Sequence, residues 1–124
     1  MTDGWRLQVH PEAVSGEQAA ELIRARKAHG LFETWFEHHS GRLLAVLTNG
    51  CRAMVMMLDE PGDAGKHAID PGATGHQGGY VLGKGQHDTY DNADTVPLEQ
   101  ALTIVEHILD CGRPPSGASW RVDQ

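Results

Sequence analysis

Five side chains capable of acid–base chemistry lie in one glycine-rich stretch of the sequence. They are His67, His76, Tyr80, His87 and Tyr90. Aspartates are interspersed with them, and loops of this composition can form a pocket on a rigid sheet. One interpretation is therefore a small enzyme with a pocket of His, Tyr and Asp side chains within residues 66–94.

The same stretch contains a near match to a phosphate-binding loop. Gly78–Gly85 has glycine after its lysine, where the motif needs Ser or Thr to bind magnesium, and no helix pattern follows it. His67, Asp70 and His76 match no known spacing of metal ligands. No histidine is placed beside Cys51, the candidate thiol nucleophile. We expect no nucleotide, no metal, no other cofactor and no catalytic residue.

Negative charge is concentrated in the second half of the chain. The net charge of the 124 residues is −7, and residues 59–110 hold ten acidic residues against Lys66 and Lys84. Moderate acidity can serve solubility alone. It also repels phosphate backbones and attracts basic proteins. We therefore expect no direct contact with nucleic acid. The charge by itself is explained by solubility, and if it serves binding, the partner it would attract is a basic protein.

Length and cysteine content indicate a single domain, residues 1–124, in a reducing compartment. A chain of this length can bury enough apolar surface to fold without disulfide cross-links. Cys51 and Cys111 are too few for a disulfide framework. Met1–His10 has no apolar run of a secretion signal, and no apolar run is long enough to span a bilayer. These features predict a cytoplasmic protein that does not associate with membranes.

Two segments have the periodicity of amphipathic helices. The first begins with a capping box at Ser15 and runs to about Ala28. The second is expected to begin near residue 94 or 95, to contain Pro97 in its first turn and to end at Gly112.

The other apolar segments predict the strands of an antiparallel meander. Leu43–Leu47 and Ala53–Leu58 flank Asn49-Gly50, which predicts a hairpin with a two-residue type I′ turn and Val46 opposite Ala53. Further strands are expected at Trp5–His10, Leu31–His38, Lys66–Ile69, Gly79–Leu82, His87–Tyr90 and Ser119–Val122. The fold class is thus α+β: one domain with an antiparallel meander sheet and two principal helices.

Both faces of the predicted hairpin are apolar. In an antiparallel sheet with one solvent-exposed face, apolar and polar side chains normally alternate along each strand. Loops such as Pro61–Gly79 are one candidate cover for the second face. Otherwise this face is a docking surface, either for another protein or for a second copy of the chain in a homodimer.

Several short motifs lie between Leu43 and Trp120. They are Leu47-Thr48-Asn49-Gly50, Arg52-Ala53-Met54-Val55-Met56, Asp59-Glu60-Pro61-Gly62-Asp63, Asp70-Pro71-Gly72, Gly78-Gly79-Tyr80-Val81, Gly85-Gln86, Thr95-Val96-Pro97-Leu98 and Trp120. Together they resemble a family of immunity proteins encoded beside bacterial polymorphic toxins, frequently toxins with deaminase-type domains. The resemblance implies an α+β inhibitor without catalytic residues.

We therefore expect the chain to bind a cognate toxin, a nucleic-acid-modifying enzyme, and to cover its active-site cleft. Acids would steer the encounter and aromatic anchors would hold the complex. The expected contact residues are Asp59, Glu60, Asp63, Asp70, Tyr80, Asp88, Tyr90, Asp91 and Asp94. The alternative is a family-like domain recruited as a biosynthetic enzyme. A deep pocket enclosing two or more of the histidines and tyrosines of residues 66–94 would favour that alternative.

Overall fold

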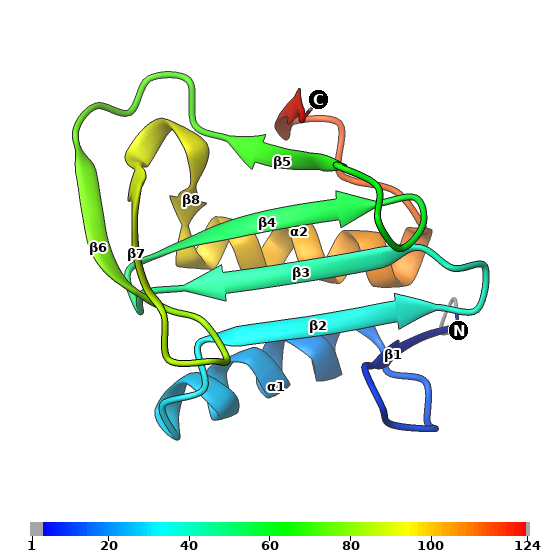
Figure 1. The fold of residues 1–124 in the computed structure, drawn as a ribbon. Helices are drawn as coiled ribbons and strands as arrows, with labels where there is room; N and C mark the ends of the chain where they lie inside the picture. Colours follow the sequence, from blue (N-terminus) through cyan, green and yellow to red (C-terminus); the bar gives the residue numbers. More distant parts are fainter. Residues whose placement is uncertain (1–3, 124) are drawn as a thin grey trace.

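Two helices pack side by side against one face of an antiparallel sheet in the computed structural model, which describes residues 4–123 (Figure 1). The helices are α1 (Gly16–Ala28) and α2 (Leu98–Cys111). The sheet contains, in spatial order, β1 (Trp5–Leu7), β2 (Glu33–His38), β3 (Leu43–Thr48), β4 (Arg52–Leu58), β5 (Lys66–Ile69) and β9 (Ser119–Val122). This order confirms the α+β class, the antiparallel meander and the two principal helices.

Three short elements lie outside this path. The two-residue strand β8 (Val96–Pro97) pairs with β4, and the 3-10 helix η1 (Asn92–Asp94) precedes it. A separate hairpin of β6 (His76–Val81) and β7 (His87–Asp91) projects from the sheet. Neither of the two helices in residues 4–123 has the length and apolar character needed to cross a membrane.

Helix α1 begins as the capping box predicts. The Ser15 hydroxyl accepts the Gln18 N–H, and the Gln18 side chain accepts the Ser15 N–H. Gly16 brings this end close to α2, because a Cβ here would lie 2.5 Å from the carbonyl oxygen of Glu106. The Gly16 N–H donates to Asp110 at 2.8 Å, which fixes the approach of the two helices.

Helix α2 begins later than predicted. It starts at Leu98 instead of residue 94 or 95, because Val96 and Pro97 pair with β4. A residue before proline avoids the helical region, which favours extended backbone at Val96. Val96 is also completely buried. The predicted end is confirmed, with Gly112 in the left-handed conformation at φ 80°.

The turn predicted between β3 and β4 is wrong, because the pairing of the two strands is shifted by two residues from the prediction. Val46 lies opposite Val55, and three residues, 49–51, separate the two strands. A type I′ turn needs two positive φ angles, but only Gly50 of this turn has one. Asn49 instead accepts the backbone N–H of Arg52 on its side-chain oxygen at 2.8 Å. A shift of two preserves the side-chain alternation, so the predicted faces are correct.

Other strand ends differ from prediction by a few residues. β1 stops at Leu7 because the chain turns there, with Val9 at φ 64° and His10 N–H donating to the Leu7 carbonyl. β2 begins at Glu33, two residues later than predicted. β6 begins three residues earlier than predicted, at His76. The strands predicted at residues 66–69 and 119–122 are confirmed.

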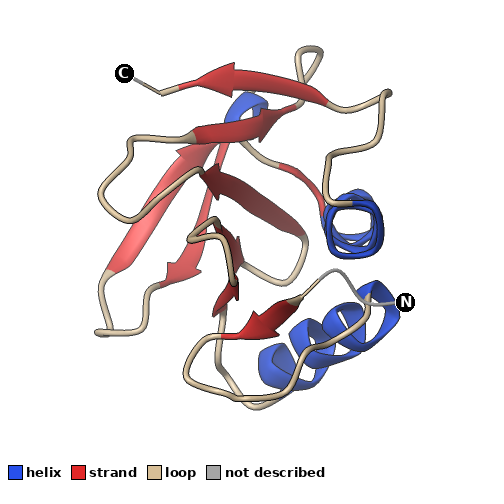
Figure 2. Ribbon diagram, turned by 90° about the vertical axis from the view of Figure 1, so that its right-hand side faces the viewer, coloured by secondary structure: helices blue, strands red, loops and turns tan. Residues whose placement is uncertain are grey.

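The helix-facing side of the sheet forms the core. Its hairpin residues are Leu44, Val46, Ala53, Val55 and Met57, all buried. Trp5 and Phe36 extend the layer, and both are fully buried beneath the two helices. The opposite side carries the β6–β7 hairpin, as Figure 2 shows. That cover comes from residues 76–91 and not mainly from residues 61–79, the loop predicted to provide it.

Candidate functional site

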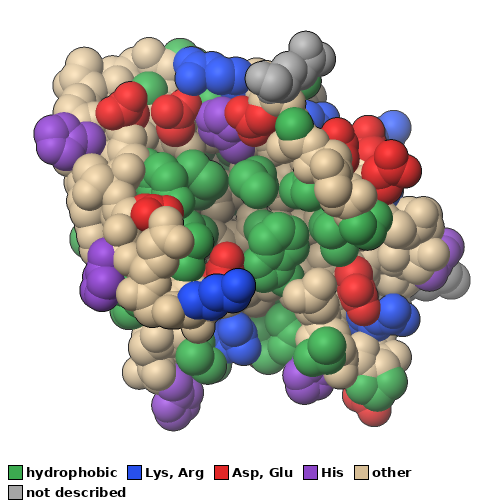
Figure 3. Space-filling model, viewed as in Figure 1, with side chains coloured by type: hydrophobic (Ala, Val, Ile, Leu, Met, Phe, Trp, Pro, Cys, Tyr) green, Lys and Arg blue, Asp and Glu red, His purple; other side chains and the backbone are tan. Residues whose placement is uncertain are grey.

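The sheet face turned away from the helices is apolar and only partly covered. We call it the open face, and its central side chains are Trp35, Leu43, Ala45, Leu47, Met54 and Met56. Antiparallel pairing places Trp35 beside Ala45 and Ala45 beside Met56. Figure 3 shows apolar side chains gathered at the centre of this face, with acidic and some basic groups around them. The prediction that both hairpin faces are apolar is therefore confirmed.

A hollow of about 220 Å³ opens where the β6–β7 hairpin meets this face. We call it the Glu33 hollow. Its lining is Glu33, Trp35, Ala45, Leu47, Met54, Met56, Leu82 and Tyr90. Seven largely apolar side chains therefore surround a single carboxylate.

Three hydrogen bonds fix the polar groups of the Glu33 hollow. The Glu33 carboxylate accepts the backbone N–H of Gly83 at 2.9 Å, which ties the β6–β7 turn to β2. The Tyr90 hydroxyl donates to Asp88 at 2.8 Å, and Gln86 donates to the same carboxylate at 2.9 Å. These bonds lower the pKa of Asp88, Gln86 contributing first and Tyr90 second.

Tyr90 is unsuited to proton transfer near neutral pH. Burial raises the pKa of its hydroxyl to about 12, and the neighbouring charges of Asp88 and Glu33 add to the shift. The hydroxyl therefore stays protonated and serves as a fixed hydrogen-bond donor.

Two neighbouring hollows continue this surface along β2. Glu33 and Gly83 line both of them, and Trp35 lines the one that reaches Val9. Val9 is 91% exposed. Glu33 thus lies near the middle of a continuous uneven surface, which is typical of a site for an extended partner.

Tyr80, one of the expected contact residues, is buried in the β6–β7 hairpin, as a residue of the strand core would be. Its side chain is 0% exposed, and its ring packs edge-on against Tyr90 with ring centres 4.9 Å apart. Burial raises the pKa of the Tyr80 hydroxyl. The buried ring of Tyr80 therefore packs against Tyr90 and does not reach the outer face of the hairpin.

Two predicted contact acids are engaged within the chain. Asp70 pairs with Arg52 at 2.7 Å, and Asp94 accepts from His67 at 3.0 Å and from Arg121 at 2.8 Å. Both carboxylates are only partly exposed. They hold the η1 region and β9 to the sheet, so a structural role accounts for them.

The remaining predicted acids fall into two groups at opposite ends of the open face. Asp59, Glu60 and Asp63 are exposed in the turn after β4, whereas Asp88 and Asp91 lie on β7 (Figure 1). The structure therefore does not gather the predicted residues into one cluster. It places acids at both ends of an apolar centre.

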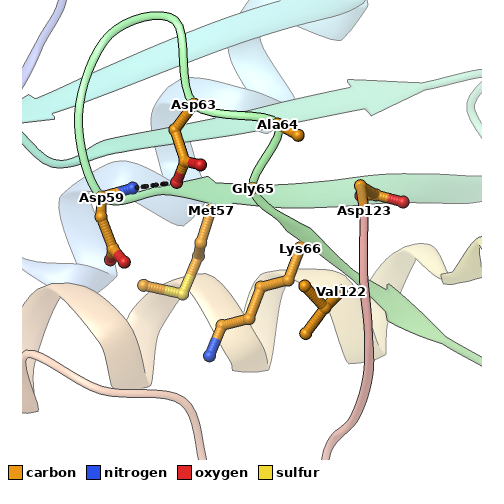
Figure 4. Close-up of a pocket in the computed structure, with 8 residues that line it drawn as sticks. All are labelled: Met57, Asp59, Asp63, Ala64, Gly65, Lys66, Val122 and Asp123. Atoms are coloured by element: carbon orange, nitrogen blue, oxygen red, sulfur yellow. Dashed lines mark hydrogen bonds between the residues drawn. The ribbon is translucent and has the colours of Figure 1, made fainter.

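A second hollow, of about 330 Å³, adjoins the β4–β5 turn. It contains the carboxylates of Asp59, Asp63 and Asp123 beside Lys66 (Figure 4). The Asp59 N–H donates to Asp63 at 3.1 Å, and the Asp123 carboxylate points away from both. The carboxylates do not converge, and residues 4–123 contain no group of three side chains placed to hold a metal ion.

The enzyme alternative required two or more of its five candidate side chains in one pocket. Among the five hollows best defined on residues 4–123, Tyr90 alone of these side chains lines one. Tyr80 and His67 are buried, whereas His76 and His87 are exposed on the hairpin. Cys51 is a free, exposed thiol in the β3–β4 turn. These hollows of residues 4–123 therefore do not meet the condition stated for the enzyme alternative.

The sequence missed Glu33 and Trp35 as site residues. Their strand was predicted, but nothing local indicates that Gly83, 50 positions later, folds back onto Glu33. Met54 and Met56 were recognised only as part of an apolar hairpin face. Their double-sided apolar pattern was the one signal that could have identified the site.

His67 is held between two carboxylates at the edge of the open face. One ring nitrogen lies 2.8 Å from Asp123 and the other 3.0 Å from Asp94. Burial lowers the pKa of His67, but the hydrogen bonds and charges of Asp123 and Asp94 outweigh it, so the pKa is raised. The protonated ring can donate to both carboxylates at once, which joins β5 to the segment after β9.

We expect the stability of the fold to depend on the protonation of His67. A raised folded-state pKa gives stabilisation that is complete below the unfolded value of about 6.5 and is lost as pH rises through the folded-state pKa. Urea unfolding between pH 5.5 and 9 should show this loss in the native sequence and not in His67→Gln. The exposed residue His76 provides the control, since His76→Gln should keep the native profile. An unchanged profile in His67→Gln would contradict this assignment.

Comparison with known proteins leaves the family of the chain open. No family model, curated protein or solved structure matches it. The resemblance to immunity proteins therefore stays a prediction, and the function is argued from the open face itself.

Proposed function

We propose that this chain is an immunity protein that binds a cognate toxin through the open face. The observation that carries the proposal is the apolar centre of that face, which the helices leave uncovered and which acids flank at both ends. Exposed apolar patches rimmed by polar groups are typical of protein interaction sites. Cytoplasmic action and the absence of catalysis belong to the same proposal.

The size of the face suits a protein partner. A standard interface buries roughly 800 Å² on each side. The chain exposes 6739 Å² in total, so such an interface would take up about an eighth of its surface. The β2–β4 centre and the two acidic ends together can supply that area, whereas the Glu33 hollow alone is too small for a drug-sized ligand.

The acidic ends favour a partner with a basic surface. Asp59, Glu60 and Asp63 at one end, with Asp91 at the other, are exposed and would attract positive charge from a distance. An enzyme that acts on nucleic acid needs a basic cleft. We therefore propose that the toxin is a nucleic-acid-modifying enzyme, of deaminase type by the resemblance, and that this chain covers its cleft.

Coexpression with the protein encoded by the neighbouring reading frame tests the proposal. We expect that protein to stop growth when expressed alone. The present chain should restore growth and copurify with it in a stable complex. Restored growth without a complex, or a complex that leaves the toxin active, would contradict direct inhibition.

Light scattering on the isolated chain tests the competing occupant of the open face. We expect a monomer, because the face should be free for the partner. A tight homodimer that persists in the presence of the neighbouring protein would identify a second copy as the occupant and overturn the proposal.

A further inference from the structure

The Glu33 hollow combines apolar walls with a carboxylate that retains free acceptor positions. Within residues 4–123, the Glu33 side chain makes one hydrogen bond, from the Gly83 N–H to Oε1. A carboxylate can accept about four. The second oxygen, Oε2, is therefore available to a donor that enters the hollow.

A second carboxylate lies at the edge of the same hollow. Asp88 accepts from the hydroxyl of Tyr90, whose ring lines the hollow. The Asp88 carboxylate lies 2.8 Å from the Tyr90 hydroxyl, and Glu33 lines the same hollow as Tyr90. A cation entering the hollow would meet negative charge at two points of its rim.

The basic side chains of Arg26 and Lys84 form no ion pair with the Glu33 carboxylate in residues 4–123, although Arg26 lines both hollows that adjoin Glu33. Arg26 donates to the Thr34 hydroxyl and to the backbone carbonyl of Glu33. Lys84 is exposed on the β6–β7 turn.

We propose that the Glu33 hollow is a site for an arginine side chain of the partner, with its aliphatic stem against Met54 and Met56 and its guanidinium at Glu33. This inference rests on the proposed function, because it assigns one anchor of the toxin interface. Arginine stems pack on apolar surface while their charged heads reach polar groups.

Arginine fits the hollow better than lysine or an apolar side chain. Trp35 and Tyr90 offer aromatic surfaces, on which a planar guanidinium stacks and against which an ammonium packs less well. Glu33 and its free oxygen offer a charged acceptor, which arginine can engage with two donors. An apolar side chain would bury the second oxygen of the Glu33 carboxylate without a donor, and that is unfavourable.

Short capped peptides test the site without any toxin. We expect Ac-Gly-Arg-Gly-NH2 to bind the isolated chain with a dissociation constant on the order of millimolar. Binding should shift the NMR signals of the Gly83 amide and the Trp35 indole. The matched peptide with citrulline, a neutral isostere of arginine, should bind at least 5-fold more weakly, and the lysine peptide should lie between them. Equal shifts from the arginine and citrulline peptides would overturn the assignment.

A pair of matched substitutions locates the contact. Glu33→Gln keeps an oxygen that can accept the Gly83 N–H, and it should weaken binding of the arginine peptide at least 5-fold. Glu37→Gln is the control on the same strand and face, because its carboxylate is already paired with Arg6 at 2.9 Å. It should change binding less than 2-fold. Equal losses of affinity in the two variants would show that overall charge, and not the position of Glu33, causes the effect. That result would overturn the proposal.

The toxin complex separates this inference from the proposed function. Glu33→Gln should raise the dissociation constant of the complex at least 10-fold. A complex that forms with unchanged affinity in Glu33→Gln would reject the arginine site and leave the inhibitor function in place. Specific arginine binding without any toxin complex would keep the site and reject the function.

Discussion

Replacing Arg52 by methionine is expected to lower the free energy of unfolding by about 3 kcal/mol, because the substitution leaves a partly buried carboxylate unpaired. Arg52 is 15% exposed, and its guanidinium donates to Asp70 at 2.7 Å. It also donates to the carbonyl oxygens of Asn92 and Thr95 at 3.0 Å and to the Thr95 hydroxyl at 2.9 Å. One side chain thus joins β4, the end of β5 and the η1–β8 segment.

Urea unfolding followed by circular dichroism measures this loss. Arg24→Met is the matched control, because Arg24 pairs with Glu99 at 2.9 Å on an exposed helix surface. Exposed pairs contribute little, so the control should change stability by less than about 1 kcal/mol. Equal losses in the two arginine variants would contradict a special role for Arg52.

The double variant Arg52→Met with Asp70→Leu checks the cause of the loss. Removing both charges avoids an unpaired carboxylate, so the pair should be more stable than Arg52→Met alone. A double variant that is less stable than the single one would show that the hydrogen bonds to Asn92 and Thr95, and not the ion pair, dominate.

Patterns formed by residues close together in the sequence predicted the helices and strands of this fold well. The capping box at Ser15 is confirmed to the residue, and Gly112 ends α2 as expected. The two faces of the β3–β4 hairpin were also correct, since side-chain alternation survives a register shift of two. These features depend on contacts within a few positions, and a single sequence contains that information.

Features set by distant contacts were not predictable in the same way. Arg52 finds its partners 18 to 43 positions away, and nothing near it in the sequence indicates them. Tyr80 was expected among the contact residues, although a core position on its strand was also open, and in the structure its ring is buried against Tyr90. Composition indicated an acidic binding protein, but the position of the open face required the three-dimensional arrangement.

Substituting Met54 by arginine is expected to weaken the toxin complex at least 100-fold, or about 2.7 kcal/mol. Met54 lines the Glu33 hollow and lies opposite Leu47 on the open face. An arginine here can direct its own guanidinium toward Glu33 and fill the hollow from within. It also adds positive charge to a surface that we expect to meet a basic partner.

Two further variants make the result specific to the open face. Met54→Leu keeps the volume and apolar character of the side chain and should change affinity less than 3-fold. Ala25→Arg adds the same charge to an exposed position of α1, on the opposite side of the sheet, and should also bind normally. If Ala25→Arg disrupts the complex and Met54→Arg does not, the partner contacts the helices. A helix-bound partner would leave the half-buried Met54, Met56 and Trp35 without a binding role, because their apolar character would then reflect only the packing of the β6–β7 hairpin.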